Sequence, residues 1–153
     1  MHKNQLVSII MNCYNGEKYL HEALDSIIDQ TYKNWELIFW DNQSTDNSAN
    51  IVLSYNDHRI KYFYSKTHTL LYEARNLAIE KSEGGYLAFL DVDDYWNSTK
   101  LEKQMLVFSK NSEVAIVYSN FSFKNEIKNT FKELNNKKLP APKYPSGIQS
   151  TPC

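Results

Sequence analysis

Short apolar runs alternate with longer amphipathic segments along most of the chain. Four runs rich in β-branched and aromatic residues have the length and composition of buried strands, at residues 6–11, 35–40, 60–64 and 86–90. Between them, apolar residues recur three or four positions apart, which predicts amphipathic helices over residues 19–28, 48–54 and 73–82. The same patterns predict a further helix around residues 101–108 and a further strand at residues 114–119.

This strand–helix alternation predicts an α/β protein with a mostly parallel sheet and helices on both faces. In such sheets, ligands bind beyond the carboxyl ends of the strands. Polar clusters follow three of the predicted strands, at residues 12–15, 41–46 and 91–94. We therefore expect these clusters to share one edge of the sheet and to form one site. In the second cluster, Ser44, Thr45 and Asp46 are each able to cap the helix that follows.

Composition excludes several classes of protein. The 153 residues suit one domain, and 42% apolar with 23% charged residues is ordinary for a globular protein. A formal net charge of -1 gives no reason to expect a nucleic-acid or anionic-lipid partner. Two cysteines are too few for a disulfide scaffold, and no apolar run is long enough for a signal peptide or a membrane span. We expect a cytoplasmic protein.

The last part of the chain differs from the rest. All four prolines lie beyond residue 139, and six lysines with two acids give residues 124–153 a net charge of +4. Few residues there could contribute to a core. We expect a compact domain over residues 1–123 and a weakly anchored segment over residues 124–153.

The acidic cluster after the fourth predicted strand is the strongest chemical signal. Asp91, Asp93 and Asp94 place three carboxylates within four residues, and their mutual repulsion favours a neutralising cation. Oxygen ligands alone suit Mg²⁺ or Mn²⁺, which commonly share their coordination with substrate phosphates. The alternative is a solvated acidic turn that caps the next helix near Ser98.

Two other clusters offer groups that could bind a nucleotide. Asp41 and Asn42 follow the second predicted strand and could hydrogen-bond a base or a ribose, although turn and cap chemistry also explains them. Tyr14 is a loop aromatic that could stack on a flat ring or pack under the turn at residues 15–16.

Arg75 is expected to open a helix, where it could bind a diphosphate. Its alternative role is a surface ion pair with Glu73 or Glu80. Only four glycines are present, so the Gly-rich phosphate loops of other nucleotide-binding proteins are excluded.

Taken in order, these motifs resemble those of the family 2 glycosyltransferases. The matching segments cover much of residues 6–120 and lie at residues 7–16, 19–27, 30–32, 41–46, 73–79 and 89–96. The resemblance implies a Rossmann-like GT-A fold, here truncated, that binds a nucleotide diphosphate sugar. Such enzymes take part in polysaccharide biosynthesis, typically with inversion at the sugar. An acceptor hydroxyl, deprotonated by a carboxylate, attacks the anomeric carbon while a metal stabilises the departing diphosphate.

The resemblance also implies roles for individual residues. Tyr14 would stack on the base, and Asp41 would contact the base or the ribose. Asp93 would ligate Mn²⁺ or Mg²⁺ bridging the diphosphate, with Asp91 beside it against ribose or sugar. Asn42 stands where many relatives carry a second acid that reads the base, so the nucleotide preference is left open.

The family's general base and acceptor-binding half lie downstream of the acidic motif. Beyond Phe123 the chain offers only Glu126 and Glu133 as acids, so no catalytic residue is assigned. We therefore expect a donor-binding fragment that is weakly active or inactive, whose parent uses a saccharide or lipid-linked acceptor, with peripheral membrane association as one option. A non-catalytic nucleotide-binding or interaction module is the alternative. A phosphatase of the haloacid dehalogenase type, with Asp91 as nucleophile, is a weaker one because Tyr95 replaces its usual Thr or Val.

Overall fold

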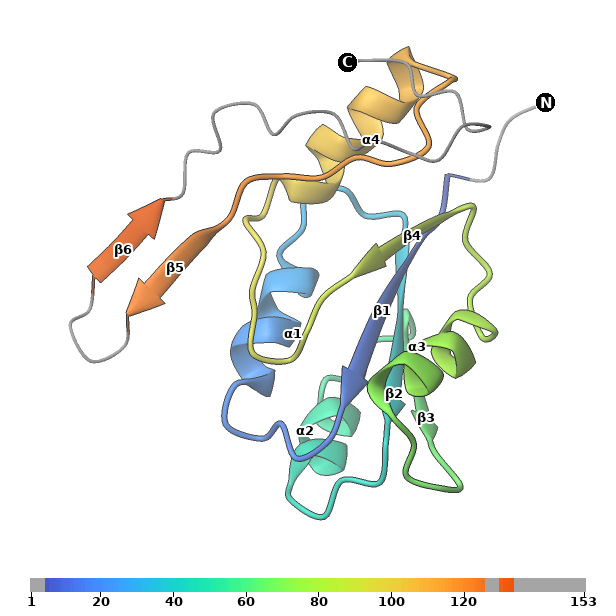
Figure 1. Ribbon diagram of the computed structural model, residues 1–153, viewed down its shortest axis with the longest axis vertical. Coiled ribbons are helices and arrows are strands. Elements are labelled where there is room, and N and C mark those ends of the chain that lie inside the picture. The colour runs from blue at the N-terminus through green and yellow to red at the C-terminus, as the bar shows by residue number, and fades with distance from the viewer. Residues whose placement is uncertain (1–4, 126–129, 134–153) are drawn as a thin grey trace. The chain divides into compact units, whose positions relative to one another are not determined.

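The computed structural model describes residues 5–125 and 130–133. The chain divides into two compact units, Met1–Glu102 and Lys103–Cys153, which are described separately. The first unit contains four strands, β1 (Val7–Cys13), β2 (Trp35–Asp41), β3 (Ile60–Tyr64) and β4 (Tyr86–Phe89). Its helices are α1 (Leu20–Ile28), α2 (Ser48–Ser54) and α3 (Leu71–Ile79), and α4 (Lys100–Lys110) begins in it (Figure 1).

The four strands form one parallel sheet in the order β3-β2-β1-β4. All seven residues of β1 and all seven of β2 are buried, which explains why both strands read as mostly apolar runs. Helices α1 and α2 lie on one side of the sheet and α3 lies on the other (Figure 1). This architecture confirms the predicted α/β, GT-A-like class.

Residue size sets how α3 packs on the sheet. Ala74 and Ala78 of α3 are buried against Ile10, Ile38 and Trp40, which project from the same face of β1 and β2. Alanine at both contact positions lets the helix approach the sheet closely. The approach holds the start of α3 beside the carboxyl ends of the strands.

A buried polar row crosses three strands near their amino ends. Ser8 of β1 donates a 2.5 Å hydrogen bond to Glu36 of β2, and Lys61 of β3 forms a 2.8 Å ion pair with the same carboxylate. The backbone N–H of Glu83 also donates to Glu36 at 2.7 Å. Burial raises the pKa of Glu36, but the bonds from Lys61, Ser8 and this N–H outweigh burial, so the pKa is lowered overall. The Glu36 carboxylate therefore joins β1, β2 and β3 through its bonds to Ser8 and Lys61.

Gly84 lies against this row just before β4. Its N–H donates to Ser8 Oγ at 2.8 Å. A Cβ at this position would lie 2.5 Å from the carbonyl oxygen of Leu6 and 2.8 Å from the backbone nitrogen of Ser8. Glycine is therefore needed for the backbone entering β4 to approach β1 this closely.

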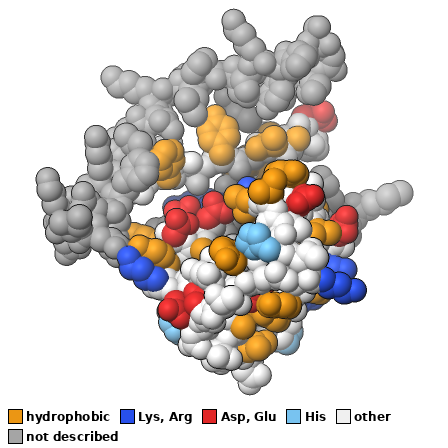
Figure 2. Space-filling view, turned by 60° about the horizontal axis from the view of Figure 1, so that its bottom comes forward, with side chains coloured by type: hydrophobic (Ala, Val, Ile, Leu, Met, Phe, Trp, Pro, Cys, Tyr) orange, Lys and Arg blue, Asp and Glu red, His pale blue; other side chains and the backbone are white. Residues whose placement is uncertain are grey.

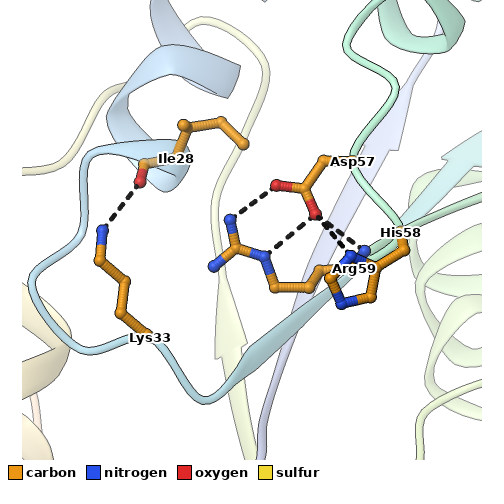
Figure 3. Close-up of polar contacts among 5 residues, drawn as sticks. All are labelled: Ile28, Lys33, Asp57, His58 and Arg59. Atoms are coloured by element: carbon orange, nitrogen blue, oxygen red, sulfur yellow. Dashed lines mark hydrogen bonds and ion pairs between the residues drawn. The ribbon is translucent and has the colours of Figure 1, made fainter.

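An ion pair stabilises the turn between α2 and β3 (Figure 3). Arg59 donates to both carboxylate oxygens of Asp57, at 3.0 and 2.6 Å, and its guanidinium lies 3.7 Å from the centre of the Trp35 ring. The hydrogen bond from Arg59, against a smaller effect of burial, lowers the pKa of Asp57 to about 2. Nearby, Lys33 Nζ approaches the last carbonyl of α1, that of Ile28, at 3.5 Å. The turn sets where β3 begins.

The structure corrects two predictions of local structure. Helix α3 begins at Leu71 and ends at Ile79, so it starts before the predicted range of 73–82. The strand predicted at residues 114–119 is wrong, because this segment is irregular. Ile116 and Tyr118 in it are 70% and 68% exposed, so they do not contribute to a core.

The second unit contains an antiparallel pair that composition did not predict, β5 (Ser122–Asn125) with β6 (Thr130–Glu133). The boundary expected at residue 123 stays a prediction, and most of residues 124–153 lies outside the described part of the chain. Among the described residues, no helix has the length and apolar character that crossing a bilayer requires.

Candidate functional site

Three polar segments meet at the carboxyl edge of the parallel sheet. They lie at the carboxyl ends of β1, β2 and β4, which are neighbours in the sheet, and they contain Tyr14, Asp41 and Asp91. Figure 2 looks onto this edge, where acidic side chains and exposed apolar side chains gather. The predicted convergence of the clusters on one edge is therefore confirmed by the strand order.

The first two segments are joined by reciprocal hydrogen bonds. The N–H of Asn15 donates to Ser44 Oγ at 3.0 Å, and the N–H of Thr45 donates to Asn15 Oδ1 at 2.7 Å. Asp46 accepts from the N–H of Ser48 at 3.0 Å, so it is the predicted capping residue that contacts the first turn of α2. Ser44 and Thr45 instead tie the two loops together, which corrects the prediction that each caps this helix.

Gly16 brings the third segment to the first. A Cβ on Gly16 would lie 2.9 Å from Cys13 Sγ and 3.1 Å from a methyl carbon of Val92. Val92 stands between the acids of the acidic loop, here defined as residues 91–94. The absence of a side chain at Gly16 therefore lets the acidic loop pack against the turn that carries Tyr14.

Asp41 is fully buried at the end of β2. Its Oδ2 accepts a 2.8 Å hydrogen bond from the Tyr62 hydroxyl, and its Oδ1 accepts a 2.7 Å bond from the N–H of Ser44. Burial and this contact with Asp41 raise the pKa of Tyr62. The carboxylate thus anchors the start of the second polar segment, and only its remaining lone pairs could serve a ligand.

Asn42 binds the loop that follows β3, here called the 65–70 loop. Its Nδ2 donates to the carbonyl of Thr69 at 2.7 Å, and its Oδ1 accepts from the N–H of Thr69 at 3.1 Å. His68 Nδ1 lies 2.8 Å from the Asn42 carbonyl oxygen. Gln43 adds a 3.0 Å bond from its Nε2 to the carbonyl of Lys66. Residues 42–43 therefore hold the 65–70 loop at three points.

Tyr14 projects from the edge with 55% of its surface exposed. The His68 ring packs against it in an edge-to-face arrangement, with ring centroids 4.5 Å apart and planes inclined by 63°. Aromatic pairs favour this geometry because the positive ring edge meets the negative ring face. Tyr14 is thus held by a second ring and still offers surface to a ligand.

Arg75 forms a 2.8 Å ion pair with Asp91, and its guanidinium lies 5.5 Å from the centre of the Phe89 ring. The alternative prediction, an ion pair of Arg75 with Glu73 or Glu80, is wrong about the partner, which is Asp91. Because α3 begins at Leu71, Arg75 lies in its second turn and does not open the helix. The ion pair links α3 to the acidic loop.

The three acids of the acidic loop are exposed to solvent. Partial burial raises the pKa of Asp94, and the negative charges of Asp93 and Asp91 raise it further. Within the described residues, no group of three His, Cys, Asp or Glu side chains is close enough to enclose a metal ion. The loop therefore offers one or two carboxylates. This donor set fits an Mg²⁺ or Mn²⁺ ion that takes its other ligands from phosphate oxygens and water.

Sequence reasoning missed His68 and Thr69 at this edge. Both lie in a short loop with neither a repeating pattern nor a charge cluster, so their contacts with Asn42 and Tyr14 follow only from the folding of β2 beside β3. A lone histidine in a polar loop carries no signal that points to either partner.

Comparisons with known proteins agree on the family. The family described as Glycosyl transferase family 2 matches residues 8–151. The chain is 40% identical over 120 residues to WfgD of Escherichia coli, named a UDP-Glc:alpha-D-GlcNAc-diphosphoundecaprenol beta-1,3-glucosyltransferase, covering 78% of this chain and 47% of the relative. It is 38% identical over 117 residues to WfaP of Escherichia coli, which carries the same enzyme name, covering 76% and 46%.

Among solved structures, the chain is similar to TarS 1-349 of S. aureus in complex with UDP-GlcNAc, with a TM-score of 0.65 and 30% identity over 69% of this chain and 32% of that one. A mannosyltransferase of Pyrobaculum calidifontis, solved with GDP-Man and Mn²⁺, shares the fold at 22% identity and a TM-score of 0.57, over 63% of this chain and 29% of that one. The chain spans about half the length of the curated relatives that it matches. Its motifs, its sheet and these matches agree, and the chain belongs to glycosyltransferase family 2.

Proposed function

We propose that this chain binds the donor of a glycosyltransferase that transfers a sugar from a nucleotide diphosphate sugar to an acceptor hydroxyl, with inversion at the anomeric carbon. The observation that carries the proposal is the edge itself. An exposed aromatic ring, an arginine and a loop of carboxylates gather beyond neighbouring parallel strands in a chain of this family. A base, a diphosphate and a cation need these three kinds of group.

UDP is the proposed nucleotide. Crystal structures of TarS, similar to this chain at 30% identity, contain UDP and UDP-GlcNAc. In the proposed complex, Tyr14 stacks on the base while Asp41 and Asn42 line the base and ribose from the end of β2. Stacking on an aromatic side chain contributes about 1–3 kcal/mol per base.

Asp93 is the proposed ligand of an Mg²⁺ or Mn²⁺ ion. Among the described contacts, Asp93 and Asp94 both lack a side-chain hydrogen bond or ion pair, whereas Asp91 is paired with Arg75. Asp93 is chosen because it stands at the metal-ligand position in the motif that resembles the family's. A bound cation would neutralise the diphosphate and so favour its departure. Asp91 would then contact ribose or sugar, and Arg75 could exchange its carboxylate partner for a phosphate oxygen.

The acceptor and the general base are not assigned to residues of this chain. Glu126 lies outside the described residues, and the side chain of Glu133 is not described. WfgD and WfaP are named for a GlcNAc-diphosphoundecaprenol acceptor. We therefore propose that the whole protein acts on a lipid-linked or polysaccharide acceptor at the cytoplasmic face of the membrane.

Calorimetry with UDP and GDP, with and without Mn²⁺, tests the donor site. We expect UDP to bind in the presence of the cation and Asp93→Asn to lose the dependence on it. Asp29→Asn is the matched control, because Asp29 is an exposed acid at the carboxyl end of α1. A folded sample that binds neither nucleotide with Mn²⁺ present would contradict the proposal.

A further inference from the structure

The 65–70 loop is held by one side-chain amide in a two-way contact. Asn42 donates through Nδ2 to the Thr69 carbonyl at 2.7 Å and accepts through Oδ1 from the Thr69 N–H at 3.1 Å. The Thr69 hydroxyl lies 3.2 Å from the same Oδ1. One amide therefore satisfies both backbone groups of a single loop residue, as a neighbouring strand would.

Only an amide can make this contact. An aspartate at position 42 would keep the acceptor for the Thr69 N–H but would put a carboxylate oxygen where Nδ2 now donates. Two acceptor oxygens, one of them charged, would then face each other at about the 2.7 Å of the present bond. Asn42 is 6% exposed, so little water is available to relieve the repulsion.

The two hydrogen bonds between the Asn42 amide and Thr69, here called the clamp, determine where His68 lies. His68 precedes Thr69 in the chain, and its Nδ1 lies 2.8 Å from the backbone carbonyl oxygen of Asn42. Because this oxygen can only accept, Nδ1 is the donor. The ring held in this way is the one that packs edge-to-face on Tyr14, at 4.5 Å. Asn42 thus reaches Tyr14 through two successive contacts, and neither contact involves a ligand.

We propose that Asn42 and His68 are positioning residues that hold the Tyr14 ring for a nucleobase. The proposal rests on the proposed nucleotide-binding function and assigns Asn42 a different task within it. The Asn42 amide is engaged with Thr69, so its part in recognition is to fix the loop, and His68 is an additional residue of the site. Rotation of the exposed Tyr14 ring is then restricted before the base arrives, which lowers the entropy lost on binding.

The test compares UDP with inorganic pyrophosphate, both with Mg²⁺, by calorimetry. The variants are Asn42→Asp, His68→Ala and His68→Phe, which keeps a ring. Asn50→Asp is the matched control, since Asn50 is an exposed asparagine whose side chain donates a 2.8 Å hydrogen bond to Asn47 Oδ1 and lies away from the 65–70 loop in the sequence. Hydrogen exchange of the Thr69 N–H follows the clamp without any ligand.

We expect Asn42→Asp to weaken UDP binding about tenfold and His68→Ala about threefold, within the loss that removing a stacked ring causes. His68→Phe should recover part of the His68→Ala loss, and pyrophosphate affinity should stay within twofold in all variants. Thr69 N–H exchange should quicken in Asn42→Asp and not in Asn50→Asp. His68 is exposed, so its variants are expected to fold even if Asn42→Asp does not.

Four results would overturn the inference. The first is an unchanged affinity for UDP in both Asn42→Asp and His68→Ala, measured beside wild-type protein that binds UDP. This result would leave the proposed function standing. The second is equal weakening of UDP and pyrophosphate, which indicates a general loss of structure. The third is wild-type protein that binds pyrophosphate but gains nothing from the base. Wild-type protein that binds neither ligand overturns the proposed function and the inference together.

Discussion

Replacement of Gly84 by alanine should destabilise the first unit more than the same replacement at Gly16, where the nearest atoms belong to side chains. The added Cβ would lie 2.5 Å from the Leu6 carbonyl oxygen, 2.6 Å from Ser8 Oγ and 2.8 Å from the Ser8 nitrogen. Two of these three atoms belong to the backbone at the start of β1, one just before the strand and one within it. No rotamer change relieves those two contacts, so β1 and the segment before β4 must separate.

The size of the effect follows from two contributions. Overpacking against rigid neighbours costs about 1–3 kcal/mol. Separation of the two segments also lengthens the 2.8 Å hydrogen bond from the Gly84 N–H to Ser8 Oγ. The loss of one hydrogen bond costs about 1 kcal/mol. We therefore expect Gly84→Ala to lower the free energy of unfolding by about 2–4 kcal/mol.

Urea denaturation followed by tryptophan fluorescence and far-ultraviolet circular dichroism measures this difference. Gly85→Ala is the control, because Gly85 is the adjacent glycine and is exposed. Ser8→Ala removes the hydroxyl but leaves both backbone contacts, so Gly84→Ala should still be destabilising in that background. A Gly84→Ala protein with the wild-type urea midpoint would refute the close approach of the segment before β4 to β1.

Three further predictions concern buried or partly buried polar groups. Glu36→Ala should destabilise the fold by about 3–5 kcal/mol, because Lys61 and the other donors of the buried row lose their acceptor, and its urea midpoint should show this. Tyr62→Phe should cost about 1–3 kcal/mol in the same assay, since the buried Asp41 loses a hydrogen bond. Asp57, with its pKa lowered from 3.8 to about 2, stabilises the fold above about pH 4, and this is lost as the pH falls towards 2. Asp57→Asn should remove about 1 kcal/mol of that pH dependence, measured as unfolding free energies between pH 2 and pH 6; an unchanged slope would argue against the ion pair.

The parts of the fold that the sequence predicts well are those governed by burial on both faces. Strands β1 and β2 are buried along their whole length, so their apolar runs identify them directly. The run at residues 114–119 has the same composition, yet it forms no strand and exposes Ile116 and Tyr118. A β-branched run is necessary for a buried strand, but it forms one only where a neighbouring strand and a covering layer exist.

The candidate site divides along a similar line. The strand order brings the predicted positions Tyr14, Asp41 and Asp91 to one edge, which follows from parallel topology alone. The partners of these residues were not predictable, because they depend on contacts between loops. Arg75 pairs with Asp91 across 16 positions, and the clamp of Asn42 spans 27. Nothing in local sequence distinguishes such a partner from any other polar residue.

The strand order also determines when the site can assemble. Strand β1 lies between β2, which follows it closely in the chain, and β4, whose first residue Tyr86 pairs with Val7. During synthesis, one edge of β1 therefore stays open until residues 86–89 have been made, whereas β2 and β3 can already pair. The acidic loop comes directly after these residues, so Tyr14 and the end of β2 are synthesised well before the acidic loop is. We therefore expect the pairing of β4 with β1 to limit the rate of folding, since these are the two paired strands that lie farthest apart in the sequence.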